Sequence, residues 1–296
     1  AIWRHRSGRA LSGQGNPKGD PPLPTRRSWA DVGPRLASAA VLIALTATAL
    51  VVGSYLFAVV VGAVYALAYR EWETMVTRAP LTSRGMVLIG LVALSGLLHP
   101  LVGLWGSFGA IILACGLVLT MEREHTIWRI VGLVLFGALI TSLMAMRGAG
   151  TVGIWAGLYL GTVVWMTDSA AFFAGRQIGG EKLAPDISPS KTWSGAFGGL
   201  ALGTGAGLLV WLWLTDSPIW IGILLSATIS ILAQAGDLTE SAIKRFFRIK
   251  DSGDIIPGHG GLMDRLDSLT FGVFFVVIVG GAHAGFGAIA AGLLHW

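Results

Sequence analysis

Long apolar stretches separated by short polar segments dominate this sequence from Leu36 to its C-terminus. Residues 36–69 contain no charged side chain, and one helix of that length would be roughly 51 Å long, well beyond a hydrocarbon core of about 30 Å. Gly53 and Ser54 offer a break, so the pattern predicts two short spans there. Further spans are expected at 85–98, 101–121, 127–146, 151–174, 192–214, 217–236 and 267–294, which makes about nine.

The apolar stretches lack the period-two alternation of a transmembrane barrel. Composition agrees with helices in a membrane: 54% of residues are hydrophobic and 12% are charged, about half the charged fraction of a soluble domain. The single cysteine, Cys115, lies within an apolar stretch and excludes a disulfide framework or a cysteine metal site. We therefore predict an all-α polytopic integral membrane protein.

The positive charges predict how the helices are oriented. With the N-terminus in the cytoplasm and nine alternating spans, twenty of the 21 Lys and Arg residues fall on the cytoplasmic side. Only Arg147 falls on the opposite side, as the positive-inside rule requires. Residues 1–35, rich in Gly, Pro and Arg, are expected to form a disordered basic tail on an anionic leaflet.

Residues 236–268 carry six of the chain's 16 carboxylates and five of its Lys and Arg residues. On a helix, Asp237, Glu240, Ser241 and Lys244 share one face. A carboxylate at a membrane boundary is costly unless it is paired, hydrated or bound to a metal. The alternative is a solvated helix end with an i,i+4 pair between Glu240 and Lys244.

Asp264 and Asp267 lie three residues apart and project to one side of a helix. Two close carboxylates favour a shared hard cation such as Mg²⁺, although aspartates at a helix N-terminus also stabilise the macrodipole. The preceding segment, Pro257–Gly261, can turn backbone N–H groups toward an anion. His259 in this segment could donate to a phosphate or act as an acid or base, whereas a plain tight loop explains the glycines equally well.

Two further segments carry candidate chemistry. Asp168 lies near the end of the 151–174 span, where an ionisable residue is a functional candidate, and Arg176 follows eight residues later. Lys191 and Thr192 lie at the start of the 192–214 span, and Lys191 could neutralise a phosphate. A structural aspartate and a positive-inside lysine are the alternatives. The predicted topology brings all these segments to the cytoplasmic edge, which favours metal-assisted phosphoryl or nucleotidyl transfer.

Two common catalytic motifs are absent from the sequence, and one glycine repeat is present. The sequence has no Walker A and no H-E-x-x-H motif. Glycines at 195, 199, 203 and 207 recur every four residues and predict a close helix-packing face, for which a subunit interface is one location.

The charged segments closely resemble the phosphatidate cytidylyltransferase (CDP-diglyceride synthase) family. Its C-terminal signature is matched at Ser241, Lys244, Arg245, Lys250, Asp251, Pro257, Gly258, His259, Gly260, Gly261, Asp264, Arg265 and Asp267. Two upstream patterns are matched at Asp168, Ala171, Gly175 and Arg176, and at Ser188, Pro189, Lys191, Thr192 and Gly195. The chain departs from the family where Phe172 and Phe173 replace a common Tyr, and where Ser190 and Ser194 replace a Lys and a Glu.

The resemblance implies transfer of a cytidylyl group from CTP to phosphatidate, giving CDP-diacylglycerol and pyrophosphate. It also implies dependence on Mg²⁺, with room for a second cation, and a homodimer in the bacterial inner membrane with its active site facing the cytoplasm. No nucleic acid partner is expected. The catalytic candidates are Asp237, Asp264, Lys244 and His259, and the metal candidates are Asp168, Asp237, Asp264 and Asp267. The candidates for binding substrate or phosphate are Lys191, Thr192, Arg176, Ser241, Arg245, Lys250, Gly258, Gly260, Gly261 and Arg265.

These predictions divide the chain into the tail at 1–35, N-terminal transmembrane helices at 36–150 and a catalytic transmembrane region at 151–296. Glu240 and Asp254 lie outside the signature and are interpreted as surface charges. A transporter is the main alternative, but it predicts ionisable residues near the midplane and repeated halves. A CDP-alcohol phosphotransferase would need a D-x-x-D-G-x-x-A-R spacing that the sequence lacks.

Overall fold

The protein is a bundle of helices with one short β-hairpin. The structure is a computed structural model that describes residues 41, 44–121, 123–253 and 261–296. Its α-helices are α2 (Ser54–Thr77), α3 (Ser83–Val102), α4 (Leu104–Val118), α5 (Thr126–Arg147), α6 (Val152–Gln177), α7 (Trp193–Leu214), α8 (Ile219–Phe246), α9 (Asp267–Ala284) and α10 (Ile289–Leu294). Two short 3₁₀ helices, η2 (Arg123–His125) and η3 (Met263–Arg265), and a hairpin of β1 (Lys182–Ala184) and β2 (Ser188–Thr192) complete the order.

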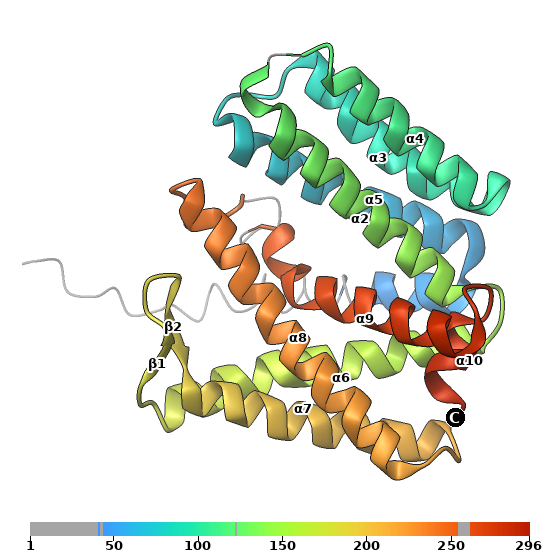
Figure 1. The fold of residues 1–296 in the computed structure, drawn as a ribbon, viewed down its shortest axis with the longest axis vertical. Helices are drawn as coiled ribbons and strands as arrows, with labels where there is room; N and C mark the ends of the chain where they lie inside the picture. The colour runs from blue at the N-terminus through green and yellow to red at the C-terminus, as the bar shows by residue number, and fades with distance from the viewer. Residues whose placement is uncertain (1–40, 42–43, 122, 254–260) are drawn as a thin grey trace, which may run out of the picture.

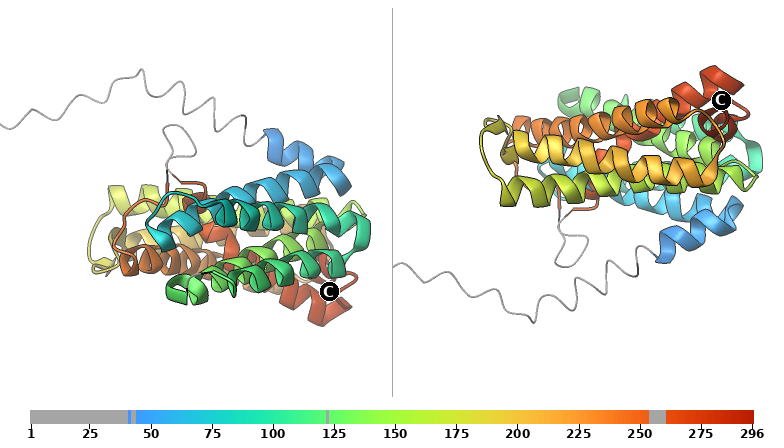
Figure 2. Two further views of the ribbon diagram at one scale, coloured as in Figure 1. Left: turned by 90° about the horizontal axis from the view of Figure 1, so that it is seen from above. Right: turned by 90° about the horizontal axis from the view of Figure 1, so that it is seen from below.

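The helices form two groups (Figure 1). Helices α2 to α5 pack together on one side, α6 to α8 on the other, and α9 contacts both α5 and α8 between them. The hairpin and the C-terminus lie at opposite ends of the bundle in each view (Figure 2).

Among the described residues, five helical segments are long and apolar enough to cross a membrane: Ser83–Val102, Arg123–Arg147, Trp193–Leu214, Ile219–Phe246 and Asp267–Ala284. Helices α2 and α6, of 24 and 26 residues, have the length as well but fall outside these five. The prediction of an all-α membrane protein is thereby supported, while the count of nine spans and the cytoplasmic N-terminus stay predictions. The expected basic tail, residues 1–35, lies outside the described residues.

The predicted break at Gly53 is confirmed. Residues 44–52 are helical, and Gly53 has a φ of 67°, a conformation that glycine adopts readily. The side chain of Arg147 donates from Nε to the carbonyl of Leu50 at 2.6 Å and from Nη2 to that of Val51 at 3.2 Å. Arg147 thus satisfies carbonyl groups that the break leaves without a helical partner.

Two predicted elements were wrong in detail. The stretch 267–294 forms two helices, α9 and α10, because the chain turns at Gly285 with a φ of 85°. Residues 175–191, left between the predicted spans 151–174 and 192–214, hold most of the antiparallel β1–β2 hairpin, in which Lys182 pairs with Thr192. The hairpin matters because β2 carries Lys191.

The glycine face of α7 packs inside the chain. A Cβ added at Gly195 would lie 2.8 Å from the carbonyl oxygen of Ala171, and one at Gly199 would lie 2.9 Å from that of Thr167, both on α6. At Gly207 the added atom would meet the side chain of Ser226 on α8. The glycines let α7 approach α6 closely, so the alternative location at a subunit interface is wrong.

Candidate active site

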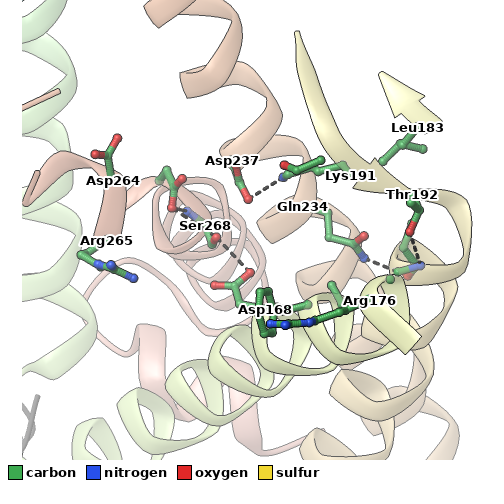
Figure 3. Close-up of a pocket in the computed structure, with 17 residues that line it drawn as sticks. Asp168, Arg176, Leu183, Lys191, Thr192, Gln234, Asp237, Asp264, Arg265 and Ser268 are labelled. Atoms are coloured by element: carbon green, nitrogen blue, oxygen red, sulfur yellow. Dashed lines mark hydrogen bonds and ion pairs between the residues drawn. The ribbon is translucent and has the colours of Figure 1, made fainter. Parts of the chain in front are cut away.

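A cavity of about 510 Å³ lies where the hairpin joins the ends of α6, α7, α8 and α9. Figure 3 shows polar side chains from these elements facing one another around it. Its lining includes eight residues singled out in the sequence: Asp168, Arg176, Lys191, Thr192, Asp237, Asp264, Arg265 and Asp267. The structure therefore brings together segments separated by as many as 99 residues of sequence, since Asp168 and Asp267 both line the cavity.

Helix α8 meets the hairpin through an ion pair. The ammonium of Lys191 lies 2.5 Å from Oδ2 of Asp237 (Figure 3). Ser241, one turn further along α8, has its hydroxyl 3.5 Å from Oδ1 of the same aspartate. On the hairpin side, the hydroxyl of Thr192 caps α7 by accepting the N–H of Gly195 at 3.1 Å. The cap fixes the direction in which the chain leaves Lys191.

A second ion pair joins α8 to η3. The ammonium of Lys244 donates to Oδ1 of Asp264 at 2.5 Å and lies 3.5 Å from the Glu240 carboxylate. Burial tends to raise the pKa of the Asp264 carboxyl, but the hydrogen bond and positive charge of Lys244 help to outweigh it. The pKa of Asp264 consequently lies below its ordinary value, and the group is ionised at neutral pH.

The start of α9 links Asp267 to Asp168 on α6. The backbone N–H of Ser268 donates to Oδ1 of Asp267 at 2.6 Å. The hydroxyl of Ser268 lies 3.1 Å from Oδ1 of Asp168 and 3.3 Å from Oδ1 of Asp267. Because one hydroxyl reaches both carboxylates, Asp168 and Asp267 face the same part of the cavity.

Four phosphate-binding candidates of the described residues lie outside the cavity lining: Ser241, Arg245, Lys250 and Gly261. Arg245 donates to the carbonyl of Ile187 at 3.2 Å and to that of Ile249 at 3.2 Å, so it braces the hairpin against the end of α8. Lys250 is exposed beyond the end of that helix. The buried Gly261 donates its N–H to Oδ2 of Asp264 at 3.3 Å. Gly258, His259 and Gly260, together with Asp254, lie outside the described residues.

Comparison with known proteins identifies the family of this chain. The profile of the cytidylyltransferase family matches residues 34–282. The chain belongs to the cytidylyltransferase family. It is 38% identical over 234 residues to the phosphatidate cytidylyltransferase of Brucella suis biovar 1 (strain 1330), which covers 79% of this chain and 86% of the relative.

Two shorter matches come from other bacteria. The phosphatidate cytidylyltransferase of Bacillus subtilis (strain 168) is 42% identical over 128 residues, 43% of this chain and 47% of the relative. The protein of the same name from Staphylococcus haemolyticus (strain JCSC1435) is 45% identical over 115 residues, 38% of this chain and 44% of the relative.

The aspartate carboxylates that line the cavity of this cytidylyltransferase-family chain are chemically suited to binding a hard cation. Four aspartates line one cavity, and carboxylate oxygen is the ligand that Mg²⁺ prefers. Within the described residues, no three Asp, Glu, His or Cys side chains already stand in a metal-holding arrangement. Two of the aspartates are instead bonded to Lys191 and Lys244. The donor set therefore fits Mg²⁺, with two ammonium groups standing beside the same carboxylates.

The interpretation of Glu240 as a surface charge was wrong. Glu240 is 8% exposed and stands beside Lys244 within the interior. The i,i+4 spacing of Glu240 and Lys244 indicated that the two side chains could interact. The periodicity of one helix does not, however, reveal which of its faces is buried by a neighbouring helix. Sequence reasoning also missed Gln234, which lines the cavity one turn before Asp237 and donates to the carbonyl of Ala196 at 3.4 Å.

Proposed function

We propose that this chain transfers the cytidylyl group of CTP to phosphatidate, giving CDP-diacylglycerol and pyrophosphate. The observation that carries the proposal is the cavity itself, where four aspartates meet Lys191, Arg176 and Arg265 at the edge of an apolar helix bundle. Phosphoryl and nucleotidyl transfers require metal-binding carboxylates together with cations that neutralise phosphate charge. The names of the bacterial relatives, all phosphatidate cytidylyltransferases, support the choice of substrates.

The reaction makes one bond and breaks one bond. An oxygen of the phosphatidate phosphate attacks the α-phosphorus of CTP, and the bond from that phosphorus to the oxygen bridging to the β-phosphorus breaks. The leaving group is pyrophosphate, which keeps the bridging oxygen and its electron pair. A phosphate monoester is already largely ionised near pH 7, so the attacking oxygen needs no strong general base from the protein.

The cations of the chain hold and orient the two phosphate-bearing substrates. Lys191 lines the cavity and stands 2.5 Å from Asp237, and an ammonium group has three donors, so Lys191 can bond a phosphate oxygen while staying close to its carboxylate. Lys244 is not among the lining residues and stands 2.5 Å from Asp264, which is, so it balances the charge of that carboxylate. Arg176 and Arg265 line the same cavity and add planar guanidinium groups that suit phosphate oxygens. Together they reduce the repulsion between the lipid phosphate and the triphosphate.

Mg²⁺ bound to the aspartates would supply charge stabilisation at the α-phosphorus and at the departing pyrophosphate. Asp237 and Asp264 are the first candidates to hold it, with Asp168 and Asp267 beside them. Ser268 orients the latter two carboxylates through its hydroxyl, 3.1 and 3.3 Å from their oxygens.

The location of the cavity suits substrates from two phases. Phosphatidate can keep its acyl chains in the bilayer beside the apolar helices, while CTP enters from water at the hairpin end. The distribution of Lys and Arg supports nine spans, a cytoplasmic N-terminus and a cavity facing the cytoplasm of a bacterial inner membrane. We also propose a homodimer, as the family resemblance implies, and light scattering with correction for bound detergent tests it.

A pyrophosphate-release assay on the purified protein tests the function. Phosphatidate is supplied with each nucleoside triphosphate in turn, with and without Mg²⁺. Release that needs both CTP and phosphatidate, and that disappears with chelation of Mg²⁺, is expected. Release that is independent of phosphatidate, or equal with all nucleotides, would overturn the proposal.

A further inference from the structure

Glu71 of α2, which no sequence motif singled out, reaches across the bundle to the segment that carries Asp264. Its side chain is buried, with 3% exposed. The carboxylate accepts the backbone N–H of Leu262 at 2.9 Å and that of Met263 at 2.8 Å. It also accepts the hydroxyl of Ser252 at 3.2 Å. Three hydrogen bonds from neutral donors offset much of the cost of burying this charge.

These contacts fix the chain immediately before Asp264. Leu262 and Met263 precede it directly, and Gly261 donates its N–H to Oδ2 of Asp264 at 3.3 Å. Two consecutive backbone N–H groups bonded to one carboxylate leave the segment little freedom to rotate. The position of Asp264 at the cavity is therefore tied to a residue of the N-terminal group of helices.

The glycines beside Glu71 show how closely the segment approaches it. A Cβ added at Gly253 would lie 3.0 Å from Oε1 of Glu71. One added at Gly261 would lie 2.9 Å from Oε2 of Glu71 and 3.0 Å from Oδ2 of Asp264. Gly261 thus lies close to both carboxylates, and a side chain there would first meet the hydroxyl of Ser252.

Glu73, two residues further along α2, provides a contrast. It is equally buried, with 3% exposed, but it pairs with Arg129, whose Nε and Nη2 each lie 2.9 Å from Oε1. Glu73 therefore joins α2 to α5 by a buried ion pair. The two carboxylates of α2 therefore have different partners. Glu71 bonds the segment that carries Asp264, and Glu73 bonds the neighbouring helix α5.

We propose that Glu71 is a positioning residue that holds the Leu262–Met263 backbone so that Asp264 faces the cavity. The effect of Glu71 on catalysis rests on the proposed cytidylyl transfer. The effect of Glu71 on the Leu262–Met263 segment rests on the hydrogen bonds alone. Glutamine at position 71 keeps the shape and one carbonyl acceptor, but its amide group would face a backbone N–H with a donor. One of the two backbone bonds is then lost.

The experiment compares Glu71→Gln with Glu73→Gln, a variant of the same helix, chemistry and burial. Hydrogen–deuterium exchange of the peptide spanning 261–266 is measured on the full-length protein in detergent. Initial rates are measured in parallel over a range of Mg²⁺ and CTP concentrations, well below the unfolding temperature and per mole of folded protein. Glu71→Asp, which keeps the charge but shortens the reach by one methylene, serves as a milder variant if Glu71→Gln does not fold.

Faster exchange of 261–266 in Glu71→Gln, unchanged exchange there in Glu73→Gln, and a partial effect in Glu71→Asp are expected. We also expect kcat to fall by about 100-fold in Glu71→Gln, as a misplacement of roughly 1 Å in a reacting site produces. The Mg²⁺ concentration for half-maximal rate should rise in Glu71→Gln and stay unchanged in Glu73→Gln. Wild-type exchange and Mg²⁺ dependence in Glu71→Gln, or equal changes in both Gln variants, would overturn the inference.

A wild-type protein that transfers nothing from CTP would overturn the proposed function instead. The exchange comparison would still decide whether Glu71 holds the segment.

Discussion

Lys191 of the hairpin and Asp237 of α8 form an ion pair of 2.5 Å across the cavity. The two side chains are 23% and 30% exposed, and a pair this accessible contributes at most about 1 kcal/mol to stability. The ion pair matters more for the charge balance of the cavity than for stability, because three other aspartates line the same cavity. The lysine offsets negative charge that would otherwise repel a triphosphate.

Replacing Lys191 with Met should therefore impair catalysis far more than folding. We expect kcat/KM for CTP to fall by about 100-fold or more, as loss of an electrostatic group at a phosphoryl-transfer site does. The melting temperature should change little. Lys182→Met is the matched control, since Lys182 is an exposed lysine of the same hairpin outside the cavity lining. Equal activity of the two variants would contradict a role for Lys191 in binding phosphate.

Asp264→Asn should abolish most of the turnover while leaving the fold intact. The amide keeps the shape, but it loses the charge that Lys244 stabilises and that a cation would need. We expect the rate to fall by about 100-fold or more and to recover only in part at high Mg²⁺. Asp216→Asn, in the turn between α7 and α8 at the opposite end, is the control. Wild-type turnover of Asp264→Asn in Mg²⁺ would refute its assignment as a required ligand.

The glycine face of α7 should tolerate no large side chain. Gly199→Leu is expected to destabilise the protein by about 3 kcal/mol, because the side chain would meet the backbone of α6 at Thr167. Gly205→Leu on the same helix should be harmless, since no atom lies within 4 Å of an added Cβ there. Thermal unfolding in detergent, followed by size-exclusion chromatography, distinguishes them. Comparable melting temperatures would argue against the packing described for α7.

Cysteine labelling in intact cells tests the orientation. In a Cys115→Ala background, Ala149→Cys, in the exposed turn after α5, should react with a membrane-impermeant maleimide from outside. Asp186→Cys, at the exposed tip of the hairpin, should react only after the membrane is permeabilised. The reverse pattern would show that the cavity faces away from the cytoplasm.

The sequence allowed prediction of the helical class, the break at Gly53 and the placement of Asp168, Lys191, Asp237 and the Asp264–Asp267 segment at one edge of the helices. These features depend on local rules, namely the length of apolar stretches, the freedom of glycine and the side on which positive charges accumulate. Each of them can be read along the chain without knowing which helices touch.

Features that depend on contacts between distant helices could not be predicted. The burial of Glu240 follows from packing around α8, and the bonds of Glu71 to Leu262 and Met263 span 191 and 192 residues of sequence. The hairpin escaped prediction because its paired strands have only three and five residues. Segments this short show no clear alternation of apolar and polar positions.

The central claim is that the cavity transfers a cytidylyl group to a lipid phosphate. The most direct measurement follows ³²P from CTP labelled at the α-phosphorus into the chloroform-extractable lipid, for the purified wild type and Asp237→Asn with phosphatidate and Mg²⁺. We predict that wild type moves α-label into lipid while γ-label stays in the aqueous phase as pyrophosphate, and that Asp237→Asn moves almost none. No α-label in lipid for the wild type, or equal transfer by both proteins, would contradict the account.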